Sequence, residues 1–373
     1  MVVIEREEEN VSQENQGKTV VVGMSGGVDS SVAAYLLKKE GYKVIGITME
    51  LWRKETPEEI SQEGGCCSLS SIEDARRVCE ALEIPHYVLN FKEVFKTAVV
   101  DNFIQEYTCG RTPNPCIRCN RYVKWEALLQ RSLELGADYI ATGHYAKIEK
   151  LPNGRYAVVK SVTDKKDQTY ALYNLTQEQL SHTLFPVGAF EKEEIRKIAK
   201  EAGLLVASKK DSQEICFIPD DDYGKFLRES GVTLPPPGDF VNKEGKVLGT
   251  HKGIYQYTIG QRKGLGIAAE SPYYVCDISV PNNQVVLGSN ADVFTTRLFC
   301  NQINYMGEAH FTEGQKVSAK IRYGAKESPC SLHYVDEETL QCDFDEPVRA
   351  VTPGQAVVFY EGSAVLGGGT IFK

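Results

Sequence analysis

Two cysteines three residues apart raise the first question about chemistry in this chain. Cys116 and Cys119 lie in the stretch TPNPCIRCN, residues 112–120, beside Arg118 and Arg121. The thiolate is the form of cysteine that attacks electrophiles and binds metals, and neighbouring positive charge favours that form. We therefore expect this stretch to handle a nucleophilic, redox or metal-dependent step.

A glycine-rich hexapeptide near the N-terminus predicts a phosphate-binding loop. SGGVDS, residues 25–30, lies between an apolar run and a helical pattern. Its two glycines let the backbone approach an anion, and the helix N-terminus presents unpaired amide hydrogens at the positive end of the helix dipole. The Walker pattern GxxxxGK[ST] is absent, and Asp29 occupies the loop instead of a lysine, which favours nucleotidyl transfer over kinase chemistry. The plainer interpretation is a tight glycine turn capped by Ser30.

The segments around these motifs alternate between apolar strands and amphipathic helices. We expect strands at residues 19–24, 43–52, 85–91 and 137–146, and helices at residues 30–41, 72–84, 123–136 and 191–205. This alternation predicts an α/β fold with a parallel sheet covered on both faces. Such sheets bind ligands at the carboxyl ends of their strands, where SGGVDS is expected to lie.

The pattern changes in the second half of the chain. Short alternating segments appear at residues 316–323, 330–335, 340–345, 355–360 and 364–372, which indicates a small antiparallel barrel or sandwich. We expect four parts: a disordered acidic tail at 1–17, the catalytic α/β domain at 18–210, a small mixed central domain at 211–280 and a C-terminal β-barrel at 281–373. No internal repeat is present.

Composition limits the class of protein. The 373 residues are 42% hydrophobic and 25% charged, with a net charge of -9, and no apolar run reaches the length of a membrane span. We expect a cytoplasmic protein with no membrane partner, whose eleven cysteines lie in a reducing compartment. Two locally basic segments, residues 111–131 and 243–263, are either solvated faces or contacts to nucleic acid.

Seven motifs in a fixed order give the chain a family resemblance. They are SGGVDS, GGCCSLS, TPNPCIRCN, ATGHYA, KKDQTYALY, DSQEICFI and GTHKGIYQYTIGQRKGLGI. From Lys18 to its end the chain resembles the tRNA-specific 2-thiouridylases of the PP-loop ATP pyrophosphatase superfamily, which implies an adenine nucleotide hydrolase-like catalytic domain. The resemblance also implies the reaction: ATP activates the C2 oxygen of the wobble uridine with loss of pyrophosphate, and sulfur then displaces AMP.

The resemblance implies a role for each matching residue. ATP is held by Gly23, Met24, Ser25, Gly26, Gly27, Val28, Asp29 and Ser30, with the Met49 backbone at the adenine and Gly143 lining the same crevice. The residues that contact tRNA are Asn114, Pro115, Cys116, His144, Lys166, Asp167, Gln168, Arg322, Tyr323 and Gln355. Because the last three lie in residues 281–373, the C-terminal β-barrel is expected to bind tRNA. Cys119 is the catalytic thiol, Cys216 carries sulfur as a persulfide, and Asp29 is a candidate ligand of Mg²⁺.

Cys116 departs from the commonest family pattern, in which many members carry Asp. Cys116, Cys119 and Cys216 could together hold a [4Fe-4S] cluster with one open iron that presents sulfide to the base. The alternatives are a persulfide relay between Cys216 and Cys119, a three-ligand zinc site, or a redox-active or merely adjacent thiol pair. We assign no role to Cys66 and Cys67.

Two other classes of function remain open from the sequence. One is a PP-loop ligase that aminates a small metabolite, although no ammonia-supplying glutaminase domain is apparent. The other is a non-catalytic RNA-binding regulator that senses iron or redox state. The preferred interpretation also requires a sulfur donor, such as a cysteine desulfurase or a sulfur-relay protein, as a partner besides tRNA.

Overall fold

The chain divides into two compact units, which are described separately. One unit comprises residues 1–98 and 116–221, and the other comprises residues 99–115 and 222–373. The computed structural model describes residues 15–52, 69–209, 215–218 and 220–373. Most of the tail expected at residues 1–17 therefore lies outside the described residues, as do Cys66, Cys67 and residues 211–214 of the DSQEICFI motif.

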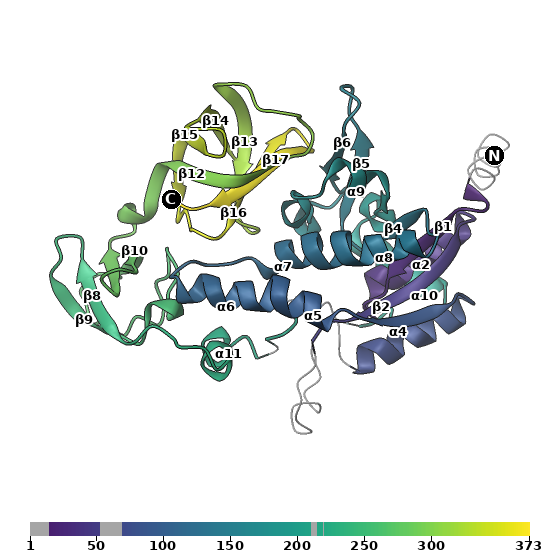
Figure 1. Cartoon of the computed structure of the whole chain (residues 1–373), viewed down its shortest axis with the longest axis horizontal. Coiled ribbons are helices and arrows are strands. Elements are labelled where there is room, and N and C mark those ends of the chain that lie inside the picture. Colours follow the sequence, from purple (N-terminus) through teal and green to yellow (C-terminus); the bar gives the residue numbers. More distant parts are fainter. Residues whose placement is uncertain (1–14, 53–68, 210–214, 219) are drawn as a thin grey trace. The chain divides into compact units, whose positions relative to one another are not determined.

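The first unit is built on a parallel sheet of five strands in the order β3-β2-β1-β4-β7 (Figure 1). The strands are β1 (Thr19–Gly23), β2 (Lys43–Glu50), β3 (His86–Asn90), β4 (Tyr139–Ala141) and β7 (Thr183–Leu184). Because β1 continues to β2 on one side while β4 lies on its other side, the strand order reverses between β1 and β4. Ligands of open parallel sheets bind at this kind of reversal, outside the carboxyl ends of the strands.

Helices cover both faces of this sheet, as the sequence predicts. The helices of this unit include α2 (Val28–Lys39), α4 (Leu69–Ala81), α5 (Lys92–Phe95), α9 (Gln177–Ser181) and α10 (Lys192–Glu201), with 3₁₀ turns η3 (Asp164–Lys166), η4 (Thr169–Leu172) and η5 (Pro186–Ala189). The π-helical η1 (Lys96–Val100) spans the boundary between the two units. Alternate β1 residues Val20 and Val22 pack into one apolar core with α2, α4 and α10. This apolar burial fixes the register of the first strand against three helices.

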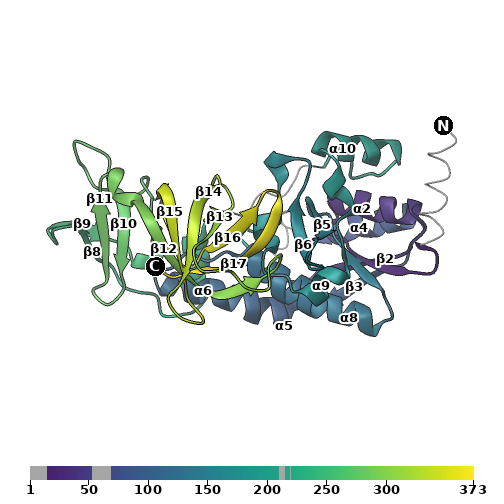
Figure 2. The same cartoon turned by 90° about the horizontal axis from the view of Figure 1, so that it is seen from above.

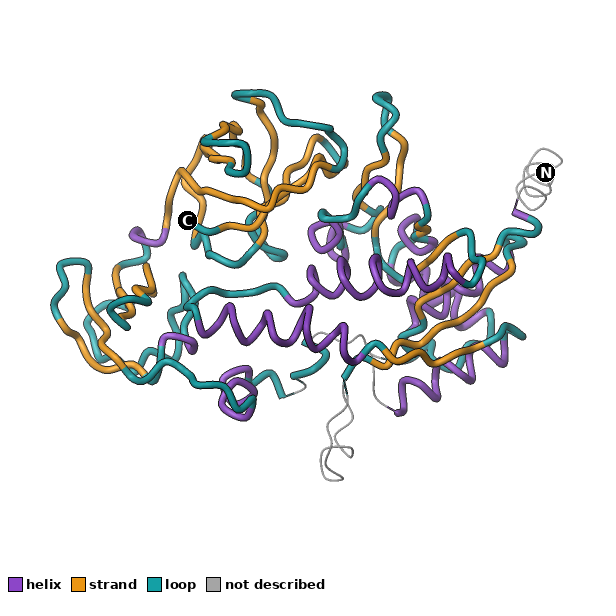
Figure 3. Tube along the Cα trace, in the orientation of Figure 1, coloured by secondary structure: helices purple, strands orange, loops and turns teal. Residues whose placement is uncertain are grey.

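One long helix carries the CIRC cysteines. It consists of α7 (Pro115–Arg118), a π-helical stretch η2 (Cys119–Leu128) and α8 (Leu129–Glu134), and Figure 3 shows it as a continuous helical tube. Trp125 and Leu128 are buried on its inner side. The unit also contains a hairpin that the sequence analysis did not anticipate, β5 (Ala146–Lys150) paired with β6 (Tyr156–Lys160).

The second unit contains a four-stranded sheet and ends in a closed barrel. The six strands β12, β15, β14, β13, β16 and β17 pair in that order, and β17 pairs back to β12 (Figure 2). Their bounds are β12 (Phe294–Tyr305), β13 (Gln315–Lys320), β14 (Ser328–Tyr334), β15 (Leu340–Arg349), β16 (Ala356–Glu361) and β17 (Ala364–Ile371). Closure leaves no edge strand to pair with another chain.

Ahead of the barrel lies a mixed region, where the sequence predicts a small central domain at residues 211–280. It contains α11 (Tyr223–Glu229), β8 (Gly238–Asn242), β9 (Val247–His251), the 3₁₀ turns η6 (Ile254–Gln256) and η7 (Ala291–Val293), β10 (Tyr274–Ser279) and β11 (Gln284–Gly288). The unit also includes α6 (Asp101–Thr108), from the part of the chain expected in the catalytic domain. The four strands form one sheet in the order β10-β11-β8-β9. Within the described residues, no helix combines the length and the apolar character needed to cross a bilayer.

Candidate active site

The SGGVDS loop lies directly after β1 and forms the first turn of α2. The helix begins with Gly27 as its N-cap, and in the described part of the chain no side chain caps that N-terminus. Ser30 is therefore not the cap that the plainer interpretation requires. Its Oγ instead accepts a hydrogen bond from the Ser25 amide at 3.2 Å and donates to the Gly27 carbonyl at 3.2 Å, which closes the loop on itself. The amides of the first helical turn stay directed at an approaching anion.

Glycine is required at two points around this loop for different reasons. Gly26 has a φ of +68°, and a Cβ there would lie 2.2 Å from the Ser71 carbonyl oxygen in α4. Gly143, which follows β4, would place a Cβ 2.6 Å from the Ser30 amide nitrogen and 2.7 Å from the Asp29 carbonyl carbon. The end of β4 thus touches the first turn of α2, so the two predicted ATP-binding segments meet at the strand-order reversal.

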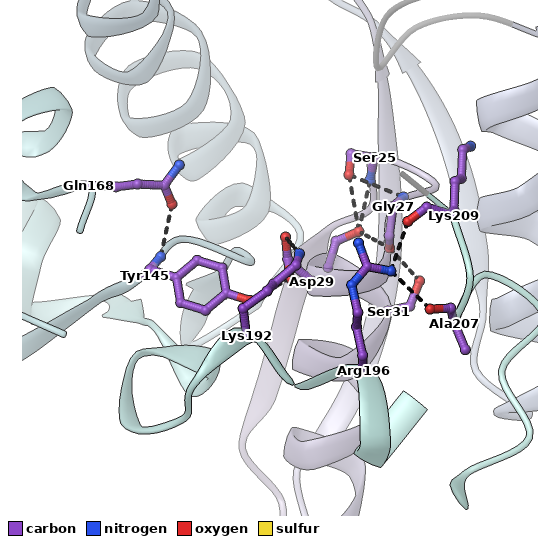
Figure 4. A network of polar contacts seen from close by, with 11 residues as sticks. Ser25, Gly27, Asp29, Ser31, Tyr145, Gln168, Lys192, Arg196, Ala207 and Lys209 are labelled. Atoms are coloured by element: carbon purple, nitrogen blue, oxygen red, sulfur yellow. Dashed lines mark hydrogen bonds and ion pairs between the residues drawn. The ribbon is translucent and has the colours of Figure 1, made fainter. Parts of the chain in front are cut away.

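The Asp29 carboxylate is held by two side chains from elsewhere in the unit (Figure 4). Its Oδ1 accepts from the Tyr145 hydroxyl at 2.7 Å and from Lys192 Nζ at 2.7 Å, and its Oδ2 accepts from the same Nζ at 2.9 Å. Neither partner is evident from the sequence, because Lys192 and Tyr145 lie 163 and 116 residues away from Asp29 in the chain. An Asp29 that is paired with an ammonium must give up this partner, at least in part, before its oxygens can bind Mg²⁺.

His144 is held as a neutral base beside a lysine. Its Nδ1 lies 2.7 Å from the Thr142 hydroxyl, its Nε2 lies 3.4 Å from Lys124 Nζ, and its ring packs against Trp125 and Phe185. Burial, and secondly the Lys124 charge, lower the pKa of His144 well below its ordinary value. We assign the tautomer that donates from Nδ1 and accepts at Nε2, which suits a positioning role better than proton transfer near neutral pH.

The helix of the CIRC cysteines is tied to the same edge of the sheet. Lys124 Nζ donates to Asn120 Oδ1 at 2.8 Å, and Asn120 Nδ2 donates to the Ala171 carbonyl at 2.8 Å. Further along the helix, Leu128 approaches Gly23 at the end of β1. Cys119 therefore lies about one helical turn before Lys124, which contacts His144. Gly143, the neighbour of His144, touches the nucleotide loop.

The three predicted site cysteines lie in different environments. Cys116 is exposed in α7, while Cys119 at the start of η2 and Cys216 are half-buried. Cys216 belongs to a short turn anchored by Phe217, whose ring lies 5.6 Å from Phe95 and 6.4 Å from Trp52. The structure shows no disulfide bond among the nine cysteines of the described residues.

These thiols do not form a metal-ligand group in the structure. Among the described residues, no three His, Cys, Asp or Glu side chains are arranged to hold a metal ion. A three-ligand zinc site therefore finds no support among these residues, whereas the [4Fe-4S] ligand set of Cys116, Cys119 and Cys216 stays a prediction, because a cluster binds its thiolates on different irons. The sequence spacing allowed either site, because ligand spacing alone does not fix side-chain geometry.

The arginines beside the cysteines turn toward an aromatic ring. The guanidinium carbons of Arg118 and Arg121 lie 4.6 and 5.0 Å from the centre of the Tyr122 ring. Arg118 also donates from Nε to the Ala98 carbonyl at 2.6 Å. Arginine guanidinium groups and aromatic rings are the kinds of group that stack on unstacked bases, although Arg121 is also ion-paired with Glu126 at 3.5 Å.

The predicted tRNA residues of the first unit border Tyr145. The Gln168 side chain accepts at Oε1 from the Tyr145 backbone amide at 2.8 Å, and the Gln168 backbone amide donates to the Tyr145 carbonyl at 3.1 Å. Asp167 accepts from the Thr169 hydroxyl at 2.7 Å, and Lys166 ends the turn η3. Met49 lies in β2, opposite Leu89 of β3, one residue before the strand ends.

In the second unit, Gln355 has a clear local role. Its amide donates to the carbonyls of Thr112 and Pro113, at 2.9 and 3.1 Å, and so holds the segment that leads to Asn114 and Pro115. Arg322 and Tyr323, expected at the end of a strand, lie in the turn after β13, which ends at Lys320. Arg322 donates to the Arg349 carbonyl at 2.7 Å, and the Tyr323 side chain is exposed.

Comparisons with known proteins cover nearly the whole chain. Family models described as the tRNA methyl transferase HUP domain, the tRNA methyl transferase PRC-barrel domain and the aminomethyltransferase beta-barrel domain match residues 18–220, 224–289 and 295–371. A curated protein of Lachnoclostridium phytofermentans, named tRNA-specific 2-thiouridylase MnmA, is 60% identical over 356 residues, which is 95% of this chain and 100% of that protein. The protein of the same name from Clostridioides difficile is 56% identical, over 95% of this chain and 98% of its own length.

Solved structures give more distant matches. The U34-tRNA thiolase NcsA from Methanococcus maripaludis, with its [4Fe-4S] cluster, is 18% identical with a TM-score of 0.35, over 61% of this chain and 73% of that chain. A 4-thiouridine synthetase–RNA complex with bound ATP is 17% identical with a TM-score of 0.32, over 57% of this chain and 50% of that chain. Likenesses this distant carry no weight for the chemistry of the present site.

Proposed function

Because the chain belongs to the tRNA-specific 2-thiouridylase family, we propose that it is an ATP-dependent sulfurtransferase that thiolates C2 of the wobble uridine of tRNA. The observation that carries the proposal is the contact of Gly143 with the first turn of α2. That contact unites the SGGVDS loop with the end of β4 and, through His144 and Lys124, with the helix that begins at Cys119. The proposed nucleotide and sulfur sites thus share one edge of one sheet.

ATP is the first substrate in this proposal. The uncapped N-terminus of α2 and the glycines of the loop offer backbone amides to the phosphates, and the backbone of Met49 offers contacts to the adenine. The uridine C2 oxygen attacks the α-phosphorus, so that an oxygen–phosphorus bond forms and pyrophosphate leaves. Asp29 is the proposed carboxylate for Mg²⁺, which would neutralise phosphate charge during this step.

Sulfur is the second nucleophile, and we place it on Cys216. The outer sulfur of a Cys216 persulfide attacks C2, and AMP leaves with the former C2 oxygen. The Cys119 thiolate then attacks the inner sulfur, which releases 2-thiouridine and leaves a disulfide bond between Cys119 and Cys216. An external thiol reduces that disulfide, and a sulfur donor such as a cysteine desulfurase or relay protein restores the persulfide.

We favour a persulfide over a cluster-bound sulfide because the two thiols of the proposed relay share one kind of environment. Cys119 and Cys216 are both half-buried, whereas Cys116 is exposed. A half-buried thiol can be shielded from competing reactions while a substrate base is bound. Cys116, with Asn114 and Pro115, is placed at the rim of the base site rather than in the relay.

The tRNA contacts are proposed on both units. The 166–168 turn, His144 and the arginine-flanked Tyr122 lie on the first unit, and the exposed turn with Arg322 and Tyr323 lies on the second. Amide, guanidinium and aromatic groups suit the unstacked bases of an anticodon loop. Gln355 contributes by holding the backbone that precedes Asn114.

The test is an anaerobic assay with purified protein, ATP, tRNA, a cysteine desulfurase with cysteine as the persulfide donor, and an external thiol in excess to reduce the disulfide. We expect ATP to be converted to AMP and pyrophosphate only when tRNA is present, and the uridine product to gain the mass of sulfur in place of oxygen. Cys119→Ser and Cys216→Ser should abolish thiolation, whereas Cys276→Ser, which changes an equally half-buried cysteine of the second unit, should not.

Other outcomes of the same assay refute the proposal in distinct ways. ATP cleavage that depends on ammonia rather than tRNA would indicate an amidating ligase, and tRNA binding without ATP cleavage would indicate a regulator. A product heavier by a methylene group would indicate methyl transfer. Iron and acid-labile sulfide that are lost in Cys116→Ala would replace the persulfide relay by a cluster.

A further inference from the structure

The nucleotide loop has no lysine of its own, yet the fold brings two lysines to it. Lys192 begins α10, and Lys209 follows α10 in the chain. Figure 4 shows both side chains beside the loop, with Lys192 at Asp29 and Lys209 on the far side of Gly27. A lysine ammonium is a compact positive charge with three donors, which suits phosphate oxygens.

The two lysines are not equivalent. Lys209 Nζ donates to the Gly26 carbonyl at 3.1 Å and to Asp74 Oδ2 in α4 at 2.7 Å. It therefore braces the backbone of the loop against a neighbouring helix. Arg196 has a similar structural role, because its Nη1 donates to the Ala207 and Lys209 carbonyls at 3.0 Å each.

Lys192 is instead paired with the one carboxylate inside the loop. Its Nζ lies within 3 Å of both Asp29 oxygens, and its side chain is only 11% exposed while that of Asp29 is 29% exposed. The aliphatic part is buried with Ile195 and Ala199 along α10. The tip is thus the polar end of an otherwise packed side chain, directed at the first turn of α2.

This pairing leaves the loop locally neutral at the place where a polyphosphate has to bind. An ATP polyphosphate next to an unscreened Asp29 carboxylate would be repelled, whereas the Lys192 ammonium attracts it. The Asp29 oxygens, once released, are the hard ligands that Mg²⁺ prefers, and that ion binds phosphate oxygens together with one or two carboxylates. One exchange of partners therefore gives Lys192, Asp29, the ATP polyphosphate and Mg²⁺ each a partner of opposite charge.

We propose that Lys192 is the polyphosphate-binding lysine that the SGGVDS motif lacks. In the nucleotide-free protein it neutralises Asp29, and when ATP binds it turns to the β- and γ-phosphates. This inference rests on the proposed function, because it assumes that ATP is the nucleotide. Tyr145 keeps the Asp29 carboxylate in place during the exchange through its hydroxyl. No bond is made or broken, since only hydrogen-bond partners change.

The test compares binding of ATP and of AMP, without tRNA, by equilibrium dialysis. Lys192→Met removes the charge but keeps an unbranched side chain, Lys192→Arg keeps the charge, and Lys200→Met makes the same change at an exposed position of the same helix. We expect Lys192→Met to weaken ATP binding about 10- to 100-fold, as the loss of hydrogen bonds between charged groups implies. AMP, which lacks the β- and γ-phosphates, should bind all four proteins equally.

A second variant separates a phosphate contact from a merely structural ion pair. If Lys192 only holds the loop in shape, then Lys192→Met and Asp29→Asn should weaken ATP and AMP binding together and lower the unfolding temperature alike. If Lys192 exchanges partners, the Asp29→Asn variant measured without Mg²⁺ should bind ATP at least as tightly as the wild type. The reason is that Lys192 then has no ion pair with a carboxylate to break before it binds phosphate.

The outcomes also distinguish this inference from the proposed function. Equal ATP affinity of Lys192→Met and the wild type, in a protein that still thiolates tRNA, would overturn the inference alone. Loss of AMP binding in the folded Lys192→Met protein would overturn it in favour of the structural role. Failure of the wild type to form AMP and pyrophosphate with tRNA would instead refute the proposed function.

Discussion

The contact between β4 and the nucleotide loop can be tested by adding a single methyl group at Gly143. An alanine Cβ would lie 2.6 Å from the Ser30 amide nitrogen and 2.8 Å from the Asp29 Cβ. Ordinary contact begins near 3.4 Å, so the first turn of α2 and the end of β4 must separate by roughly 0.8 Å. The backbone of Gly143 has no positive φ, so the effect is purely steric.

Two measurable losses follow from this displacement. Overpacking of this kind typically lowers the free energy of unfolding by about 1 to 3 kcal/mol. A shift approaching 1 Å in a substrate-positioning element can reduce the rate of the chemical step by on the order of 100-fold. We therefore expect Gly143→Ala to weaken ATP binding and to slow tRNA-dependent pyrophosphate release, measured by a coupled pyrophosphate assay.

Gly136→Ala is the matched control for stability. Gly136 lies just before β4 with a φ of +82° and no heavy atom within 4 Å of an added Cβ. Alanine there strains the backbone by about 1 kcal/mol without moving a neighbour, so stability should fall while ATP affinity is unchanged. The reasoning is wrong if Gly143→Ala binds ATP as the wild type does, or if both variants weaken ATP binding equally.

Three further predictions concern single groups. The pKa of His144 is lowered below its ordinary 6.5 in the folded protein, so the unfolded chain takes up the proton first as the pH falls. The free energy of unfolding should therefore be full above pH 6.5 and decrease below it, by up to about 1.4 kcal/mol per pH unit. His144→Gln should flatten that slope in urea titrations. Gln355→Ala removes donors from two backbone carbonyls, so we expect about 1 to 3 kcal/mol lower stability without tRNA present, measured by urea unfolding, and an unchanged midpoint would limit Gln355 to RNA contact. Burial raises the pKa of Cys79 and Cys330 to about 12. Brief alkylation of the native protein at pH 8, followed by mass spectrometry, should therefore show label on the exposed Cys116 and none on Cys79 or Cys330. Early labelling of Cys330 would contradict the closed barrel.

Local sequence patterns determined the catalytic fold and the nucleotide loop. The valines of TVVVG alternate between two buried faces, and the helix after SGGVDS begins within the motif, so periodicity and glycine placement are sufficient to predict a strand, a loop and a helix. These properties depend on neighbours in the chain, which is why a single sequence reveals them.

Local patterns were less informative about where elements end. The strand expected through residue 146 ends as β4 at Ala141, and the strand expected through Tyr323 ends at Lys320. The two-residue strand β7 is too short to show any alternation. In each case pairing with a partner strand sets the boundary, and that partner is distant in the sequence.

Only the tertiary structure decided which charges and amides meet at the site. Lys192 reaches Asp29 across 163 residues, and Gln355 reaches the Thr112 carbonyl across 243 residues. The same structure shows that Cys116 is exposed while Cys119 and Cys216 are half-buried, a difference that their spacing in the sequence does not reveal. Hydrogen bonds and ion pairs of this kind depend on the direction of side chains after strands and helices have packed, and no periodicity along the chain records that direction.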